Sequence, residues 1–306
     1  DPQWAFAFTL SSGARLVVLD RFRPRELWTK ISHYDAVFFY CLAAMPLMLL
    51  SSPAEPHERA HRLRVIMCSA IPAEQHRELE ERFGVPWLEA YGATETGSSL
   101  GVSWTDHARC VGVATIGKPL PHREARIVDD LMVSVEEGEI GELLVRGGAM
   151  MTCYWKNPEA TREAFHDGWY RTGDLCRRDT DGFYHLVGRK KDMIRRAGEN
   201  IAAAEVEAVL HQHPAVTLAA CVPVPDPLRN EEIKVFLITS QEVKVGELVA
   251  FLESRLAGFK IPRFWSFVDS LPMTPSERVA KPRLARDVGP DVFDRQAEAA
   301  HIRSGA

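Results

Sequence analysis

The chain has 306 residues, of which 46% are hydrophobic and 26% charged, as in a soluble globular protein long enough for two domains. Its formal net charge of −5 gives no electrostatic reason to expect nucleic-acid binding. The longest apolar run, Ala36 to Leu50, has 15 residues and contains Pro46, so it is too short to span a membrane. The first residues, Asp1 to Trp4, lack the basic start and apolar core of a signal peptide, and we predict a cytoplasmic protein.

Cysteine and histidine spacing gives no metal or disulfide pattern. The six cysteines stand at positions 41, 68, 110, 153, 176 and 221, without a Cys-x-x-Cys pair. Such scattered thiols indicate a reducing compartment rather than a disulfide framework or a zinc site. His211 and His213 are two residues apart, which is not ligand spacing on one helical face, so we predict no zinc site.

The first hundred residues alternate between strand and helix patterns. The predicted strands are residues 15–19, 36–40, 64–68 and 86–91, and the predicted helices are residues 24–31, 44–50 and 72–83. Alternation at this spacing favours a parallel sheet with helices on its faces, and ligands bind such sheets beyond the carboxyl ends of the strands. Residues 69–71 and 92–97 follow two of the strands and are therefore candidate site segments.

The pattern of hydrophobic residues changes after residue 110. Short alternating runs at 124–128, 142–146 and 183–187 predict a β-rich region, punctuated by glycines. Residues 202–306 predict a small α+β domain, with one helix around Val206 to Leu210, strands at 218–224 and 233–238, and a helix at 247–256. We therefore predict an α/β fold in three parts: 1–110 from a large domain, 111–190 as its β-rich subdomain, and 191–306 as a small mobile domain.

One hairpin pattern carries two charges suited to a nucleotide. Asp181-Gly182 is a turn signal before the strand at 183–187, and Asp174 and Arg189 stand at the two ends of this hairpin. A carboxylate can accept both hydroxyl hydrogens of a ribose, and a guanidinium suits a phosphate. Spacing alone nevertheless favours an ordinary surface hairpin with solvated charges.

Several motifs in a fixed order outweigh that simpler interpretation. They are Tyr-Gly-Ala-Thr-Glu at 91–95, Gly-Glu-Leu at 141–143, Arg-Thr-Gly-Asp at 171–174 and Gly-Arg-Lys-Lys-Asp at 188–192. This series resembles the adenylate-forming superfamily of acyl-CoA synthetases, peptide-synthetase adenylation domains and beetle luciferases, and it covers nearly the whole chain. Residues 34–50 and 64–97 look closest to carnitine- or crotonobetaine-CoA ligase-like enzymes.

The resemblance implies a role for each residue of the first motif. It assigns Thr94 to the phosphates, Glu95 to Mg²⁺ and Tyr91 to the adenine, with Gly92 between them. One carboxylate suffices because Mg²⁺ also takes nucleotide phosphates as ligands. On the residues alone, Thr94 and Glu95 also fit a turn with a solvated glutamate, and Tyr91 fits a core-facing strand residue.

Small residues at 69–71 resemble the segment that lets adenine approach the backbone. Ser69, Ala70 and Ile71 occupy it, where many relatives have glycines. A plain strand end turning into the next helix explains them equally well. The resemblance also places Phe39 and Met45 in the acyl pocket, although apolar residues of this kind are more often plain core.

The same resemblance assigns residues near the predicted domain boundary. Asp174 matches the ribose-binding aspartate, Arg189 the ribose- and phosphate-contacting arginine, and Lys191 the hinge residue. Gly198 matches the loop that lines the pantetheine channel of coenzyme A, because glycine lets a thin chain pass close to the backbone. A solvated basic face and a helix N-terminal turn are the simpler alternatives for this stretch.

The chain departs from the family near its C-terminus. Relatives carry Pro-x-Thr-x-x-Gly-Lys, where the lysine reaches the carboxylate and α-phosphate, whereas here Glu277 and Arg278 stand at the glycine and lysine positions. Lys281 follows three residues later. We assign the adenylation role to Lys281, since an ammonium matches it better than a planar guanidinium, and keep Arg278 as the alternative.

The predicted function is that of an ATP-dependent acyl-CoA synthetase. The resemblance implies ATP, Mg²⁺ and coenzyme A as cofactors, and a carboxylic acid as the substrate. The family's Ser/Thr/Gly-rich phosphate loop is absent, so we expect the chain to be the C-terminal part of a longer protein. The alternatives are an adenylation domain that loads a carrier protein and an inactive nucleotide-binding scaffold. The sequence leaves the identity of the acid and the formation of a homo-oligomer open.

Overall fold

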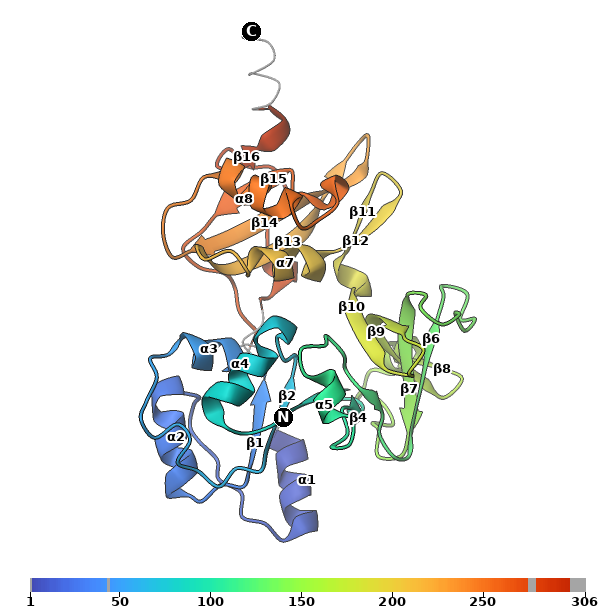
Figure 1. The fold of residues 1–306 in the computed structure, drawn as a ribbon. Coiled ribbons are helices and arrows are strands. Elements are labelled where there is room, and N and C mark those ends of the chain that lie inside the picture. Colours follow the sequence, from blue (N-terminus) through green and yellow to red (C-terminus); the bar gives the residue numbers. More distant parts are fainter. Residues whose placement is uncertain (1, 43–44, 275–278, 298–306) are drawn as a thin grey trace. The chain divides into compact units, whose positions relative to one another are not determined.

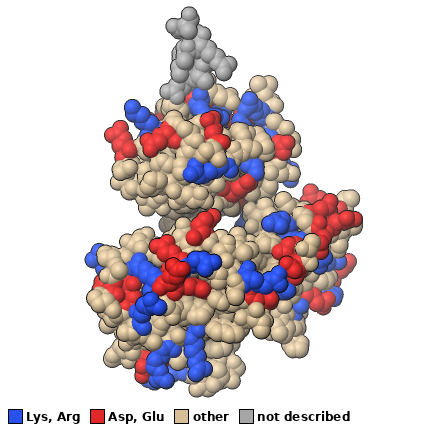
Figure 2. Space-filling view, viewed as in Figure 1, with Lys and Arg blue, Asp and Glu red and all other residues tan. Residues whose placement is uncertain are grey.

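The computed structural model describes residues 2–42, 45–274 and 279–297. The chain divides into two compact units, the first comprising residues 1–172 and 176–186, the second residues 173–175 and 187–306. Each mixes helices and strands, in agreement with the predicted α/β class (Figure 1). On the face drawn in Figure 2, acidic and basic side chains lie interspersed on both units. No described helix combines the length and the apolar character that crossing a membrane requires.

A mixed five-stranded sheet forms the centre of the first unit. Its strands, in spatial order, are β1 (Phe38–Leu42), β2 (Val65–Ser69), β3 (Trp87–Ala93), β4 (Gly97–Gly101) and β5 (Lys118–Pro119). The first three are parallel, as predicted, but β4 and β5 are antiparallel to their neighbours. Only three residues join β3 to β4, and a connection this short cannot make the crossover that a parallel pair needs.

Three helices pack against β1–β3 and build the core of this region. The helices of the first unit are α1 (Pro2–Ser12), α2 (Pro24–His33), α3 (Met45–Ser51), α4 (Ala73–Phe83), α5 (His107–Cys110) and α6 (Pro158–Ala164). Helix α4 buries Leu79 and Phe83 on one face, and Trp28 of α2 stacks on Phe83 with ring centroids 4.4 Å apart. Gly84 ends α4 in a left-handed conformation, φ +69°, which glycine adopts without strain. Phe39 and Met45 pack against the same core.

Residues 15–19 differ from the prediction of a buried strand. They form no regular structure, and Val18 is 80% exposed. A β-branched, apolar composition matches a strand, but a strand also needs a hydrogen-bonded neighbour. Among the described residues none is paired with this segment.

The predicted β-rich region is a second sheet. Its strands are β6 (Arg123–Val128), β7 (Gly141–Gly147), β8 (Phe165–His166), β9 (Trp169–Arg178) and β10 (Tyr184–Arg189). The order is β10-β9-β7-β6, with β8 paired to β9. Leu143 of β7, Tyr170 of β9 and Tyr184 of β10 are buried together in its core.

The second unit contains a six-stranded sheet. Its strands are β11 (Met193–Arg196), β12 (Glu199–Ala202), β13 (Val216–Asp226), β14 (Asn230–Thr239), β15 (Phe264–Phe267) and β16 (Phe293–Asp294). Helices α7 (Ala203–Leu210) and α8 (Val245–Glu253) bury their apolar stripes against it, and short 3₁₀ turns occupy 190–192, 258–260 and 281–283. The long antiparallel hairpin of β13 and β14 is its framework, in one register from Leu218↔Ile238 to Asp226↔Asn230, with a shift between Val216 and Leu218.

A buried ion pair ties β11 to β14 in this unit. Arg196 Nε lies 2.7 Å from Glu232 Oε2, and Glu232 is fully buried. Arg229 adds a second, more exposed contact of 2.7 Å to the other carboxylate oxygen. Because both charges of the Arg196–Glu232 pair have left water, either one alone would be strongly destabilising.

We therefore expect Glu232→Gln to lower the free energy of unfolding of the second unit by about 3 kcal/mol, because the buried Arg196 guanidinium loses its counter-charge. Hydrogen exchange of the β14 amides measures the effect within this unit. Arg229→Ala is the control, and its loss should stay below about 1 kcal/mol because its side chain is partly exposed. Equal losses in the two variants would contradict the assignment of the energy to the buried pair.

Candidate functional site

The turn between β3 and β4 carries the first predicted motif. Thr94, Glu95 and Thr96 form this turn, with Thr94 exposed, Glu95 half-buried and Thr96 buried. Ala93 donates its N–H to Thr96 Oγ1 at 3.1 Å, and that hydroxyl donates to Gly97 O at 3.0 Å. Thr96 thus holds the turn together from within and leaves Thr94 facing solvent.

Glycine is required at position 92 for steric reasons. A Cβ atom there would lie 2.2 Å from Gly97 O, far inside contact distance. The register between β3 and β4 also shifts between Tyr91 and Gly92, so the strands approach closely at this point. Gly92 therefore allows β3 to lie close to the start of β4, whether or not a ligand is bound.

Two side chains outside the motif hold the turn from other elements. Arg123, the first residue of β6, donates to Ser98 O at 3.2 Å, to Thr96 O at 2.8 Å and to Gly148 O. Tyr154 donates its hydroxyl to Glu95 Oε1 at 2.8 Å, and burial together with this carboxylate raises the pKa of Tyr154, so its proton stays available. The sequence analysis missed both residues because an arginine at a strand start and a loop tyrosine carry no distinctive pattern.

The second segment, at the end of β2, lies at the same sheet edge. Because β2 and β3 are parallel, their carboxyl ends meet at one edge, as predicted for residues 69–71 and 92–97. Ser69 donates its hydroxyl to Ala90 O at 2.8 Å, and Tyr40 donates to Ser69 Oγ at 3.1 Å. Ala70 has a left-handed backbone, φ +70°, which is unusual for a residue other than glycine.

A buried glutamate completes this segment. Glu89 of β3 accepts the N–H of Ala70 at 2.6 Å and that of Ile71 at 2.7 Å, one with each carboxyl oxygen. Burial raises the pKa of Glu89 to about 8 and outweighs the lowering effect of the two N–H groups. The sequence analysis missed Glu89, although a charged residue inside the run Trp87-Leu88-Glu89-Ala90-Tyr91 was an available signal.

Asp174 and Arg189 face each other in the second unit. Arg189 Nε lies 2.9 Å from Asp174 Oδ1, and Asp174 is buried while the Arg189 side chain is 56% exposed. Asp174 and Arg189, the two residues predicted to bind the nucleotide, thus form an ion pair with each other. Because the Arg189 side chain is exposed, its guanidinium is accessible to a ligand while it pairs with the buried Asp174.

The remaining predicted residues of this unit lie on exposed connections. Lys191 is exposed in the 3₁₀ turn between β10 and β11. Gly198, with φ +89°, follows Ala197, φ +51°, in the two-residue turn between β11 and β12. Gly198 therefore belongs to a β-hairpin turn with two positive φ angles, and the alternative of a helix N-terminal turn is wrong.

Lys281 is engaged within the second unit. Its Nζ lies 2.7 Å from Glu207 Oε1 and 3.8 Å from Asp192 Oδ2, and its side chain is only 15% exposed. Lys281 is therefore not a solvated surface lysine. Glu277 and Arg278 lie outside the described residues.

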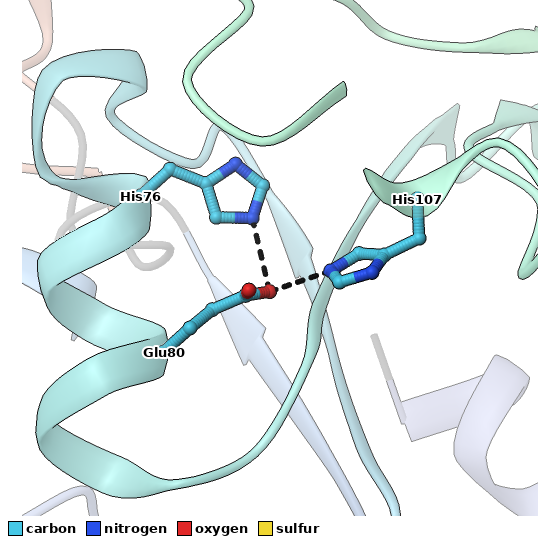
Figure 3. A group of neighbouring side chains, drawn as sticks. All are labelled: His76, Glu80 and His107. Carbon is cyan, nitrogen blue, oxygen red and sulfur yellow. Dashed lines mark hydrogen bonds and ion pairs between the residues drawn. The ribbon is translucent and has the colours of Figure 1, made fainter. Parts of the chain in front are cut away.

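His76, Glu80 and His107 form a further cluster of titratable groups (Figure 3). Glu80 Oε1 lies 3.4 Å from His76 Nε2 and 2.6 Å from His107 Nε2, and it accepts the N–H of Trp87 at 2.7 Å. Gly112 N donates to His76 Nδ1 at 3.5 Å, which leaves Nε2–H to donate to Trp87 O at 3.0 Å. These hydrogen bonds join α4 to β3 and α5.

Two family models match this chain. One, described as AMP-binding enzyme, matches residues 2–155, and the AMP-binding enzyme C-terminal domain matches residues 205–278. The crotonobetaine/carnitine–CoA ligase of Salmonella typhimurium is 33% identical over 282 residues, and the sulfoacetate–CoA ligase of Cupriavidus necator is 33% identical over 278. Each alignment covers 90% of this chain and 54% of the relative, so the chain spans about half the length of these curated relatives.

Solved structures give the same result. The o-succinylbenzoate CoA synthetase of Bacillus subtilis, in complex with its acyl-adenylate intermediate, is 30% identical with a TM-score of 0.84, covering 93% of this chain and 58% of that one. The same enzyme in complex with ATP and magnesium ion is 30% identical with a TM-score of 0.82, over 92% of this chain and 58% of that one. These matches agree with the resemblance inferred from the motifs.

We expect the stability of the chain to fall between pH 6 and 7.5 through Glu89. With a pKa of about 8 when folded and 4.5 ordinarily, Glu89 keeps its proton only in the folded chain across this window. Its stabilising contribution is therefore complete below pH 4.5 and is lost as the pH rises towards 8. The slope is about 1.4 kcal/mol per pH unit, or roughly 2 kcal/mol over this window.

Urea unfolding of the wild type and of Glu89→Gln at pH 6 and 7.5 measures this contribution. The glutamine does not titrate, so the variant should lose about 2 kcal/mol less than the wild type over this interval. Glu80→Gln is a matched control, because Glu80 also accepts a backbone N–H of β3. The explanation fails if Glu89→Gln keeps the full pH dependence of the wild type.

Proposed function

This chain belongs to the AMP-binding enzyme family, and we propose on that basis that it supports an ATP-dependent acyl-CoA synthetase reaction. In this reaction a carboxylate attacks the α-phosphorus of ATP and pyrophosphate leaves, and the thiol of coenzyme A then attacks the acyl carbon and AMP leaves. Support comes from the named activities of the relatives, which are CoA ligases, and from the acyl-adenylate complex of the structural neighbour.

The observation that carries the proposal is the pair of fixed backbone segments at one sheet edge. Residues 69–71 end β2, and the Thr94–Thr96 turn ends β3, and both are held by side chains from neighbouring elements. Rigid donors and carboxylates placed in advance are what stabilisation of phosphate charge requires. We assign Thr94 to the α-phosphate, and Tyr91, Gly92 and residues 69–71 to the adenine.

Glu95 is the proposed magnesium ligand. Its carboxylate is half-buried, and one oxygen already accepts the Tyr154 hydroxyl, so the group is oriented and suits a hard cation. When bound, Mg²⁺ neutralises charge on the nucleotide phosphates. The Tyr154 contact fits this role because a neutral donor orients the carboxylate without competing as a second charge.

In the second unit we assign Asp174 to the ribose hydroxyls and Arg189 to the ribose and phosphate. Lys191 is the proposed hinge, which puts the start of the small domain at residue 191, and Gly198 is assigned to the pantetheine channel. The exposed positions of Lys191 and Gly198 leave their backbones free of core packing, as a hinge and a channel wall require.

Lys281 and Arg278 remain competing assignments for the adenylating cation. Lys281 must leave Glu207 to reach a substrate, and the two charges lie 2.7 Å apart with limited exposure. Its recruitment therefore costs more than that of a free surface lysine. A scaffold that binds nucleotide without adenylating is the alternative function, and this engaged lysine is the observation that favours it.

We expect Asp174→Ala to weaken AMP binding by about tenfold, since losing charge-assisted hydrogen bonds that water partly replaces corresponds to about 1.4 kcal/mol. Titration calorimetry of the chain with AMP measures the change. Asp181→Ala, an exposed carboxylate paired with Arg109 at 2.6 Å, should leave AMP affinity unchanged. Unchanged affinity in Asp174→Ala removes this residue from the site.

The adenylating cation is tested by exchange of labelled pyrophosphate into ATP, dependent on an added carboxylic acid, in the natural full-length protein. If Lys281 acts, Lys281→Ala should reduce exchange by on the order of several hundredfold, as the loss of a major electrostatic group does, while Arg278→Ala reduces it much less. The opposite ranking assigns the role to Arg278. No exchange with any acid by the wild type, together with AMP binding, supports the scaffold.

A further inference from the structure

A cavity in the second unit is lined by three arginines. Its volume is about 430 Å³, within the roughly 300–1,000 Å³ that small-molecule pockets in proteins have. Its lining residues are Arg196 and Ala197 at the end of β11, Glu199 of β12, Arg229 of the β13–β14 turn, Phe259, and Arg295 and Gln296 after β16. All of them belong to the second unit, and none has a role in the reaction proposed above.

The positive charge at this cavity is only partly neutralised. Arg196 and Arg229 share the buried carboxylate of Glu232, each with a closest contact of 2.7 Å. Glu199, which is paired with Arg196 across β11 and β12, is exposed to water. The three guanidinium groups of the cavity thus outnumber these two carboxylates, and the excess falls on Arg295.

Arg295 has no close counter-charge in the described part of the chain. The carboxylate nearest to it is that of Glu253, whose Oε1 lies 3.9 Å from Nη1, beyond hydrogen-bond distance. Arg295 Nε is buried and has no hydrogen-bond acceptor among the described residues. Burial, and then the charge of Arg196, lower the pKa of Arg295 from its ordinary value. This guanidinium has lost water without gaining a counter-ion, an unfavourable state that a bound anion relieves.

The arginines are held in place before any ligand arrives. The N–H of Arg295 donates to Arg263 O at 3.1 Å, and Arg263 is itself fixed by Asp294 at 2.9 Å. Arg196 is held by its buried ion pair and by a hydrogen bond from Nη1 to Phe259 O. Side chains ordered in advance lose less conformational freedom on binding, so more of the electrostatic attraction is available to the ligand.

We propose that this cavity binds a phosphate dianion, either free or as the phosphate group of a small monoester. A planar guanidinium presents parallel N–H donors that match two phosphate oxygens, and a dianion suits an excess of positive charge better than a monoanion does. The cavity is larger than a phosphate group, which leaves room for the organic part of an ester. This inference does not depend on the proposed function.

Titration calorimetry of the chain with inorganic phosphate and with phenyl phosphate, at constant ionic strength, tests the inference. Arg295→Gln should weaken the binding of both by about tenfold, or 1.4 kcal/mol, since at least one charge-assisted hydrogen bond is lost. Arg255→Gln is the matched control, because it removes the same charge from an exposed position of the same unit, and it should leave both affinities unchanged.

Glu199→Gln tests the same site in the opposite direction. It removes a negative charge from the cavity wall, so both probes should bind about threefold more tightly, the size of one exposed charge interaction. A gain in affinity cannot arise from unfolding, so this variant keeps the test decisive if Arg295→Gln does not fold. Tighter binding of phenyl phosphate than of phosphate assigns the site to a monoester, and equal binding assigns it to free phosphate.

Arg189→Gln separates this cavity from the proposed nucleotide site. Arg189 does not line the cavity, so its loss should leave the affinity for inorganic phosphate unchanged. The inference is overturned if the wild type shows no saturable binding of either probe. It is also overturned if the Arg295 and Glu199 variants bind both probes as the wild type does, or if the loss of affinity is confined to Arg189→Gln.

Discussion

The close approach of β3 and β4 at Gly92 is the constraint on which the candidate site depends. A Cβ atom at position 92 would collide with Gly97 O. The chain turns back within three residues after β3, and Thr94 and Glu95 stand at the tip of that turn. Such a turn would be mobile without support, because few of its groups are paired by the sheet. Arg123 supplies the support by gathering carbonyl oxygens from residues 96, 98 and 148.

Acidic side chains in this molecule act repeatedly as partners for backbone N–H groups. Glu89 binds those of residues 70 and 71, Glu80 binds Trp87, and Glu207 accepts the N–H of Cys221 at 2.6 Å. Each lies where a strand or connection leaves N–H groups without a sheet partner, and an unpaired buried N–H group costs about 1–3 kcal/mol. The carboxylates therefore fix irregular backbone close to the regular elements.

Local patterns were sufficient to predict most elements but not their partners. Alternation predicted β1–β3 and α4 because burial of one face dictates those periods. The same reasoning failed at residues 15–19, where composition matched a strand without a neighbour to pair with, and it did not predict β4, which pairs antiparallel to β3. Motif resemblance proposes Thr94 and Asp174 as site residues, whereas Glu89 and Arg123 were missed because bonds to distant backbone atoms leave no trace in residue spacing.

The proposed ligand-binding charges differ in how readily they can change partners. Arg189 is exposed, so water or a nucleotide phosphate can replace Asp174 beside its guanidinium, whereas the buried Asp174 needs another hydrogen-bonding partner in its place. Lys281 and Glu207 are both mostly shielded, and separating them leaves two desolvated charges unless a ligand compensates. A substrate that carries its own negative charges can supply this compensation, whereas a neutral ligand cannot. If Lys281 serves in adenylation, its release from Glu207 is therefore coupled to the arrival of an anionic partner, which restricts the freed ammonium to the loaded enzyme.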